Sequence, residues 1–141
     1  MYEEYVKAMV NRCSVAKLLG IEVYEVGHGI AKGRLTMRAE LLNMFGMPHG
    51  GVLFTFADQV AAACGNTLGK QAVAVESTIH FVRPATGESE LLAEAVLTHT
   101  SKSIGRMDVK VATRNGDTVA LMHQLFFIKE KEHAVPPSEH I

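Results

Sequence analysis

The chain has 141 residues, of which 48% are hydrophobic and 21% are charged, and its formal net charge is −1. This length fits one domain that buries most of its apolar surface, and the composition is ordinary for a globular protein. The near-neutral charge, without a block of Lys or Arg, gives no electrostatic support to a nucleic-acid or anionic-membrane partner. No apolar run reaches bilayer-spanning length, and the charged N-terminus lacks a secretion signal, so we expect a cytoplasmic protein.

The first elements are expected from hydrophobic periodicity. Apolar residues recur at helical spacing over residues 2–18, and Gly20 is a plausible end of that helix. Two strands, 21–27 and 30–38, then flank a glycine-containing turn, which is typical of a hairpin.

The most apolar part of the chain, residues 52–64, is predicted to be a helix, and an irregular segment at 43–48 precedes it. Four strands are expected after this helix, at 72–83, 89–99, 105–114 and 118–128. Asn115-Gly116 favours a tight hairpin between the last two, since both residues tolerate positive φ.

The end of the chain differs in composition from the rest. Residues 130–141 are charged, contain two prolines and have little apolar content, so we expect a flexible tail. The folded domain is therefore predicted to span residues 1–129.

Antiparallel strands around one long apolar helix predict an α+β domain in which a curved sheet wraps the helix. A helix that is apolar nearly all round must be covered on every side. Because one curved sheet covers only part of it, we expect a partner subunit to cover the rest.

Asp58 is the single acid within the apolar run 52–64. A carboxylate there is costly to desolvate unless it is paired or used, and aspartate favours caps and turns over helix interiors. A buried functional acid facing a cleft explains its presence. The structural alternative is a strip of helix that reaches water.

The region around this acid resembles a known motif, Asn-x-x-Gly-x-x-His-Gly-Gly…Asp. The matching residues are Asn43, Gly46, His49, Gly50, Gly51, Phe54 and Asp58. They resemble hotdog-fold acyl-CoA thioesterases of the phenylacetic-acid-degradation type, within the hydroxybenzoyl-CoA thioesterase superfamily. Residues 81–85 resemble the family's strand that ends in an Arg-Pro corner, and the whole resemblance covers about 19–128.

The resemblance implies a fold, an assembly and a reaction. It implies a hotdog fold, with sheets paired edge to edge into a homodimer and dimers often doubled into a homotetramer. It also implies hydrolysis of an acyl- or aryl-CoA thioester to free acid and coenzyme A, with no cofactor beyond the coenzyme A of the substrate.

Thioester hydrolysis needs a donor that polarises the carbonyl and a base or nucleophile that brings in water. A helix start offers free N–H groups and a positive dipole end, and Gly50 and Gly51 allow a close approach to them. The resemblance places the oxyanion donor at the Gly50 amide, a helper at Asn43 and the catalytic carboxylate at Asp58. Whether Asp58 attacks directly or activates water stays open.

Gly50 and Asp58 lie eight residues apart, which is about 12 Å along a helix. They are too far apart to serve one carbonyl carbon from one subunit. Two-fold pairing of antiparallel helices would bring Asp58 of one chain near Gly50 of the other, so we expect a shared site. Thr55, Gln59 and Asn66 are expected to be hydrogen-bonded at the subunit contact.

His49 has two interpretations. It either contacts the substrate or braces the turn through backbone hydrogen bonds, and the second is favoured because the sequence offers no partner for a base role. The seven histidines and two cysteines show no ligand spacing, so no metal site is expected.

Coenzyme A would need cationic and polar contacts for its phosphates. The resemblance implies as substrate-binding candidates Gly51, Arg83, Pro84, Lys102, Ser103 and Arg106. The alternative is that the charges among them are solvated turn residues. Ala74 occupies the position where the family commonly carries a hydroxyl, with Ser77 and Thr78 nearby but not aligned.

Two other functions on the same fold stay open. An acyl-CoA hydratase or dehydratase would use a histidine with an acid, which His49 and Asp58 could supply. A non-catalytic acyl-CoA-binding module is the second alternative, and Ala74 at the hydroxyl position makes it credible.

Overall fold

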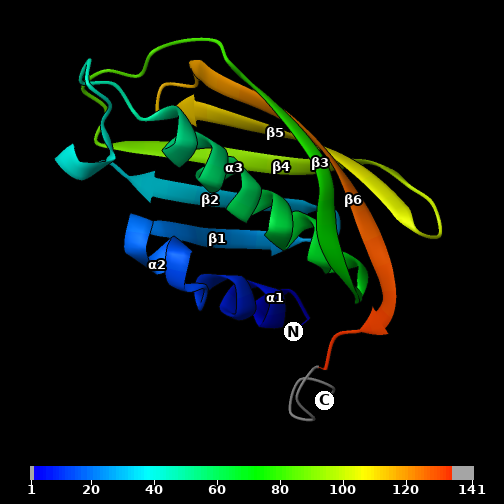
Figure 1. Cartoon of the computed structure of the whole chain (residues 1–141). Helices are drawn as coiled ribbons and strands as arrows, with labels where there is room; N and C mark the ends of the chain where they lie inside the picture. Colours follow the sequence, from blue (N-terminus) through cyan, green and yellow to red (C-terminus); the bar gives the residue numbers. More distant parts are fainter. Residues whose placement is uncertain (1, 135–141) are drawn as a thin grey trace.

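One antiparallel sheet organises the protein (Figure 1), which the computed structural model describes over residues 2–134. Its six strands are ordered β1-β2-β4-β5-β6-β3. They are β1 (Ile21–Gly27), β2 (Ile30–Thr36), β3 (Lys70–Phe81), β4 (Glu90–Thr100), β5 (Ile104–Thr113) and β6 (Thr118–Glu132). The helices are α1 (Tyr2–Asn11), α2 (Ser14–Leu19) and α3 (Gly50–Gly65), with 3-10 turns at Ala39–Leu41 and Asn66–Leu68.

The central helix α3 lies against one face of the curved sheet, and α1 and α2 lie beside β1 (Figure 1). The helix α3 contacts all six strands. Its buried residues are Leu53, Phe56, Ala57, Val60, Ala61, Ala63, Cys64 and Gly65. The predicted α+β fold, with a sheet wrapped around one helix, is therefore present.

The rest of the chain leaves part of α3 uncovered. Gly51 and Asp58 are exposed, and the partly buried residues of the helix are Gly50, Val52, Phe54, Thr55, Gln59 and Ala62. These residues include the apolar side chains of Val52 and Phe54 beside small and polar ones. Whether a partner subunit covers them stays a prediction.

The polar residues expected at a subunit contact are instead bonded within the chain. Gln59 Nε2 donates to the Val10 carbonyl of α1 (2.7 Å), and Thr55 donates to the Gly51 carbonyl one turn back (2.8 Å). Asn66 Nδ2 donates to the Ala62 carbonyl (2.8 Å).

The predicted helix over 2–18 is wrong in one respect, because it divides after Asn11. The Asn11 side chain turns to β1, where it donates to the Val23 carbonyl (2.8 Å) and accepts from the Val23 N–H (2.9 Å). These bonds pair the backbone N–H and carbonyl of Val23, which lies on an edge strand next to a register shift. Gly20 ends α2 with φ of 80°, as predicted.

The strand β6 runs further than predicted, so the expected tail is wrong at its start. β6 continues to Glu132, which pairs with Lys70 of β3. His133 then donates its N–H to the Gly69 carbonyl (3.2 Å). The charged composition favoured a flexible tail from residue 130, but the backbone of β6 pairs with β3 as far as Glu132. Residues 135–141 of the predicted tail lie outside the described residues.

The hairpin between β5 and β6 forms as predicted, but its turn is not the expected one with positive φ at both Asn115 and Gly116. The Thr113 N–H donates to the Asp117 carbonyl (2.9 Å), and Gly116 has φ of 91°. Asn115 does not share that positive φ, so only the glycine uses its conformational freedom. In the described part of the chain, no helix is long and apolar enough to cross a bilayer.

Candidate active site

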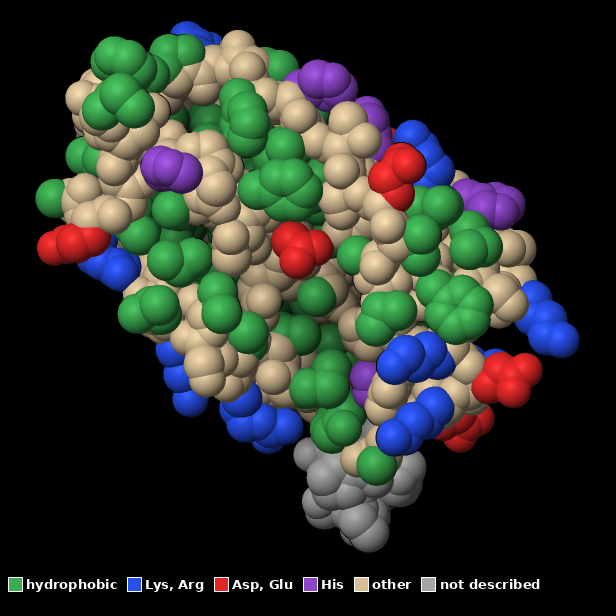
Figure 2. Space-filling model, in the orientation of Figure 1, with side chains coloured by type: hydrophobic (Ala, Val, Ile, Leu, Met, Phe, Trp, Pro, Cys, Tyr) green, Lys and Arg blue, Asp and Glu red, His purple; other side chains and the backbone are tan. Residues whose placement is uncertain are grey.

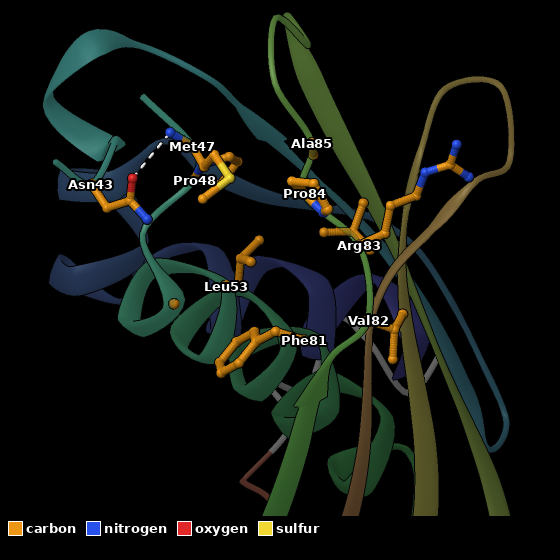
Figure 3. A pocket seen from close by; sticks show the side chains of 11 residues that line it. Asn43, Met47, Pro48, Leu53, Phe81, Val82, Arg83, Pro84 and Ala85 are labelled. Carbon is orange, nitrogen blue, oxygen red and sulfur yellow. Dashed lines mark hydrogen bonds between the residues drawn. The ribbon is translucent and has the colours of Figure 1, made fainter. Parts of the chain in front are cut away.

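The loop before α3 is held by the side chain of Asn43. Its Oδ1 accepts from the N–H groups of Phe45 (2.9 Å) and Met47 (3.1 Å), and the second of these bonds is visible in Figure 3. The carboxamide oxygen is thus occupied by the backbone. Within residues 2–134, Nδ2 has no acceptor, and Asn43 lines a cavity.

His49 caps the start of α3. Its Nδ1 accepts from the Gly51 N–H (2.9 Å), and a Cβ at position 51 would lie 3.1 Å from that nitrogen. Glycine at 51 therefore leaves room for the cap, and this contact is the brace that the sequence favoured for His49. A role for His49 or Gly51 toward substrate stays a prediction.

The first cavity lies at the start of α3 and has a volume of about 450 Å³ (Figure 3). Its wall includes Gly50, Leu53 and Phe81. A Cβ on Gly50 would stand 3.3 Å from the Phe81 ring, so glycine permits this close approach. The Gly50 N–H is one of the helix-start donors that lack an intrahelical acceptor. It shares this cavity with the Asn43 amide.

Asp58 lies in a different cavity, of about 200 Å³. Small residues make much of its wall, including Ala61, Ala62, Gly65 and Ala74. Such small side chains leave room beside Asp58.

The Asp58 carboxylate is held by a side chain from the far end of the sequence. Gln124 Nε2 donates to Asp58 Oδ1 (2.8 Å) and to Ser77 Oγ (2.9 Å). Gln124 is buried, whereas Asp58 is exposed in the single chain. The predicted buried acid is thus wrong for one chain, and the strip of helix that reaches water is what the chain shows.

The two cavities are held apart by the strand beside the helix. β3 brings Phe81 to Gly50, while its Ser77 shares Gln124 with Asp58. Four strand residues span about 13 Å, which matches the roughly 12 Å that eight helix residues span. Gly50 and Asp58 therefore do not meet within one chain.

The predicted coenzyme A contacts are also divided. Arg83 and Pro84 line the first cavity, and Arg83 forms an exposed ion pair with Asp117 (3.2 Å). An exposed pair of this kind contributes little to stability, which leaves the guanidinium available for other contacts.

The remaining candidates, Lys102, Ser103 and Arg106, lie at the opposite end of the sheet, around the β4–β5 turn. β6 gives the separation, since it pairs with Phe81 near one end and with Ile104 seven residues further on. Seven strand residues span about 23 Å. One chain therefore does not bring these residues to Arg83.

Gln124 is the functional candidate that the sequence analysis missed. It occupies an inward position of β6, between the buried residues Met122 and Phe126. A polar residue on the core-facing side of an alternating strand was the available signal.

Ser77 was judged not to match the family's hydroxyl position, which the sequence assigned to Ala74. In the structure it is Ser77 whose hydroxyl joins the network around Asp58. A register shift between Ala74 and Glu76 adds a residue to β3, and residue spacing alone does not reveal such a bulge.

The buried thiol of Cys64 is another candidate nucleophile. Burial raises the pKa of the Cys64 thiol to about 12, which leaves it protonated and unreactive at neutral pH. Among residues 2–134, no group of three or more His, Cys, Asp or Glu side chains could hold a metal ion.

Comparison with known proteins identifies the family of this chain. The sequence profile of the thioesterase superfamily matches residues 45–120, which include Gly50, Asp58 and Arg83. The acyl-coenzyme A thioesterase PaaI of Escherichia coli is 37% identical over 114 residues, 81% of each chain.

This chain belongs to the thioesterase superfamily. The structure of E. coli PaaI, from the phenylacetic acid degradation operon, superimposes on this thioesterase with a TM-score of 0.86 and 32% identity, over 92% of this chain and 96% of PaaI. A mutant of PaaI from Thermus thermophilus gives 0.77 and 30% identity, over 82% and 98%. The predicted hotdog fold, the family and the thioester hydrolase class are thereby confirmed.

Proposed function

We propose that this thioesterase hydrolyses acyl-CoA thioesters to the free acid and coenzyme A at a site shared between two subunits. One observation carries the proposal: the free donors of Gly50 and Asn43 lie in one cavity and the Asp58 carboxylate in another. The identity with an acyl-CoA thioesterase over 81% of the chain supports the substrate class.

In this proposal, the thioester carbonyl oxygen accepts from the Gly50 N–H and from Asn43 Nδ2. As the carbonyl carbon becomes tetrahedral, these donors and the positive end of α3 stabilise the negative oxygen. The Asn43 side chain is already fixed by its bonds to Phe45 and Met47, so little reorganisation is needed.

Asp58 supplies the second half of the reaction. As a base, it takes a proton from water while the water oxygen bonds to the carbonyl carbon. As a nucleophile, it bonds to that carbon itself, and water then cleaves the anhydride. In both routes the C–S bond breaks and the coenzyme A sulfur leaves and gains a proton. The choice between them stays open.

We infer that the two subunits meet along β3. This strand is a sheet edge of 12 residues, and Val73, Val75 and Phe81 are 45%, 60% and 54% exposed. Long apolar edges are seldom left open in stable proteins. On the face that carries α3, hydrophobic side chains gather over α3 and β3, while Lys and Arg lie toward the rim (Figure 2).

A two-fold axis beside β3 sets the α3 helices antiparallel, so Asp58 of the partner subunit faces Gly50. The same rotation exchanges the ends of the sheet and moves the partner's β4–β5 turn toward Arg83. This would reunite Arg83 with Lys102, Ser103 and Arg106 around coenzyme A. Assembly of dimers into a tetramer, the cytoplasmic location and the lack of a cofactor stay predictions.

The two alternative functions are less well supported. A hydratase would need a free histidine, but the Nδ1 of His49 is bonded to the backbone of Gly51. The non-catalytic module rested on a missing hydroxyl, and Ser77 supplies one beside Asp58.

A panel of short-chain, long-chain and aryl acyl-CoAs tests the function through release of free thiol. We expect release with at least one substrate, and its loss in Asp58→Asn. Enzyme should be kept at nanomolar concentration, since the partly exposed thiol of Cys13 reacts with the thiol reagent.

Other outcomes would reject the proposal. Loss of enoyl absorbance from crotonyl-CoA without thiol release would indicate a hydratase. Thermal stabilisation by acyl-CoA without turnover would indicate a binding module.

A further inference from the structure

Gln124 is a polar side chain on the core-facing side of β6, and it is 3% exposed. It lies directly across from Ser77 of β3 in the strand pairing. Directly opposed side chains share one face of the sheet with Cβ atoms about 5 Å apart. Gln124 thus reaches the acid on α3 and the hydroxyl on β3 from one position.

The chemistry of the contacts fixes the orientation of this amide. Both hydrogens of Nε2 are used, one by Asp58 Oδ1 (2.8 Å) and one by Ser77 Oγ (2.9 Å). An amide turned the other way would place its oxygen against an ionised carboxylate, which has no hydrogen to donate. The side chain therefore has one satisfactory rotamer state.

The hydrogen bond from Gln124 restricts the rotation of the Asp58 carboxylate, which the backbone of α3 does not. Asp58 is exposed, and an exposed carboxylate rotates freely unless a partner holds it. The bond to Gln124 occupies Oδ1 and leaves Oδ2 for other contacts. Donors that hold a reacting group in one geometry lower the cost of reaching the transition state.

We infer that Gln124 is a positioning residue that aims the Asp58 carboxylate, and that Ser77 holds Gln124 in place. The inference rests on the proposed function, in which Asp58 is the catalytic carboxylate. Because Ser77 belongs to the edge strand β3, the aim of the acid depends on the strand that we assign to the dimer contact. Gln124 acts only through the carboxylate, which it holds at Oδ1.

The direct test replaces Gln124 by a side chain of similar length without a donor. Gln124→Met conserves most of the volume, and an apolar residue suits the core side of β6. We expect kcat to fall about 10- to 100-fold, as for a displaced catalytic group, with KM changed less than about threefold.

Gln59→Met is the matched control. Gln59 is the neighbour of Asp58 in sequence and also donates one amide bond from the side of α3, but to the Val10 carbonyl. We expect it to lower the melting temperature and to leave kcat within about twofold, since it does not contact the acid. A kcat for Gln124→Met within the range of this control would overturn the inference.

Ser77→Ala tests whether the serine acts through Gln124. If it does, kcat falls about three- to tenfold, and the double variant with Gln124→Met is no slower than Gln124→Met alone. Additive losses would show that Ser77 acts independently and would contradict its assigned role.

Two further outcomes are distinguished by the same assay. If Gln124→Met does not fold, Gln124→Glu replaces it as the test. Glutamate keeps the shape of glutamine, but it removes the amide donor and brings a second carboxylate next to Asp58. We expect kcat to fall at least as far as for Gln124→Met, with Gln59→Glu as the control. If wild type releases no thiol, or Asp58→Asn keeps full activity, the proposed function fails. If Asp58→Asn is inactive and Gln124→Met keeps the control rate, only the inference fails.

Discussion

The two ends of the site along α3 are built in different ways. At the helix start, the hydrogen bonds of the side chains join residues close in sequence: Asn43 with Phe45 and Met47, and His49 with Gly51. Two turns further on, Asp58 depends on Gln124, which is 66 residues away. The side chains that hold the proposed oxyanion donors are therefore bonded to the local chain, whereas the proposed catalytic acid is bonded to the sheet.

This difference explains how the parts should respond to substitution. The helix start should keep its geometry whenever its loop is intact, because its bonds do not depend on sheet packing. The Asp58 region should respond to changes in β3 and β6 far from it in sequence.

The largest effect is expected from removing the acid. Asp58→Ala should lower kcat by about 10²- to 10⁴-fold, because a general base or nucleophile is lost. The fold should be retained, since alanine has the highest helix propensity and Asp58 lies on the open strip of α3. Thiol release and a thermal melt check both statements, and a variant with more than about a tenth of wild-type kcat would contradict them.

A smaller loss is expected at the other end of the site, where Asn43 has two separable roles. Asn43→Asp keeps an oxygen for the N–H groups of Phe45 and Met47 but removes the Nδ2 donor. We expect a melting temperature near that of wild type, with kcat lowered by about 10²- to 10³-fold, as for loss of one oxyanion donor.

Asn43→Ala is the comparison for that variant. It removes donor and brace together, so its kcat should fall as far and its melting temperature should fall as well. Full activity in Asn43→Asp would show that the amide hydrogens are not used and would limit Asn43 to the loop.

The smallest effect concerns the far end of α3, where distant parts of the chain again meet. His133 bonds through its ring to Asn66, which lines the Asp58 cavity (2.8 Å). Burial lowers the pKa of His133 below its usual 6.5, and a hydrogen bond that the ring donates to the Lys70 backbone opposes this only in part.

Because the folded state disfavours protonation, His133 contributes stability that is fully present above pH 6.5 and is lost as the pH falls through the folded pKa. Wild type should therefore lose more melting temperature between pH 7.5 and 5 than His133→Gln does. Equal losses in the two proteins would remove His133 from the pH response.

The sequence predicted the parts of the site that local patterns determine. The apolar run around Asp58, the glycines at 50 and 51 and the brace by His49 all depend on nearby residues, and the approximate positions of the strands along the chain followed from alternation. Local patterns were less successful for α1, whose break at Asn11 serves a bond to Val23 of β1.

What the sequence did not predict depends on contacts between distant residues. The network of Ser77 and Gln124 requires the pairing of β3 with β6 and the register shift after Ala74. The separation of Arg83 from Lys102 also follows from strand pairing rather than from spacing. Contacts of this kind depend on how all the strands pair in the sheet, so they cannot be read from a local motif.

In the proposed dimer, each active site takes its donors from one subunit and its acid from the other. Asp58→Ala and Asn43→Ala chains, refolded together in equal amounts, test it most directly. Random pairing makes half of the dimers mixed, and each mixed dimer has one site with both defects and one with neither. Activity should therefore return to about a quarter of wild type.

A pair with both defects on the same half of the site provides the control for this measurement. Asp58→Ala mixed with Gln124→Met leaves no sound site in the mixed dimer and should not exceed the average of its parents. If the Asp58→Ala and Asn43→Ala mixture is as inactive as its parents, while mass spectrometry shows that mixed dimers form, the shared site is contradicted. A shared site predicts recovery near a quarter of wild-type activity, with no recovery in the control.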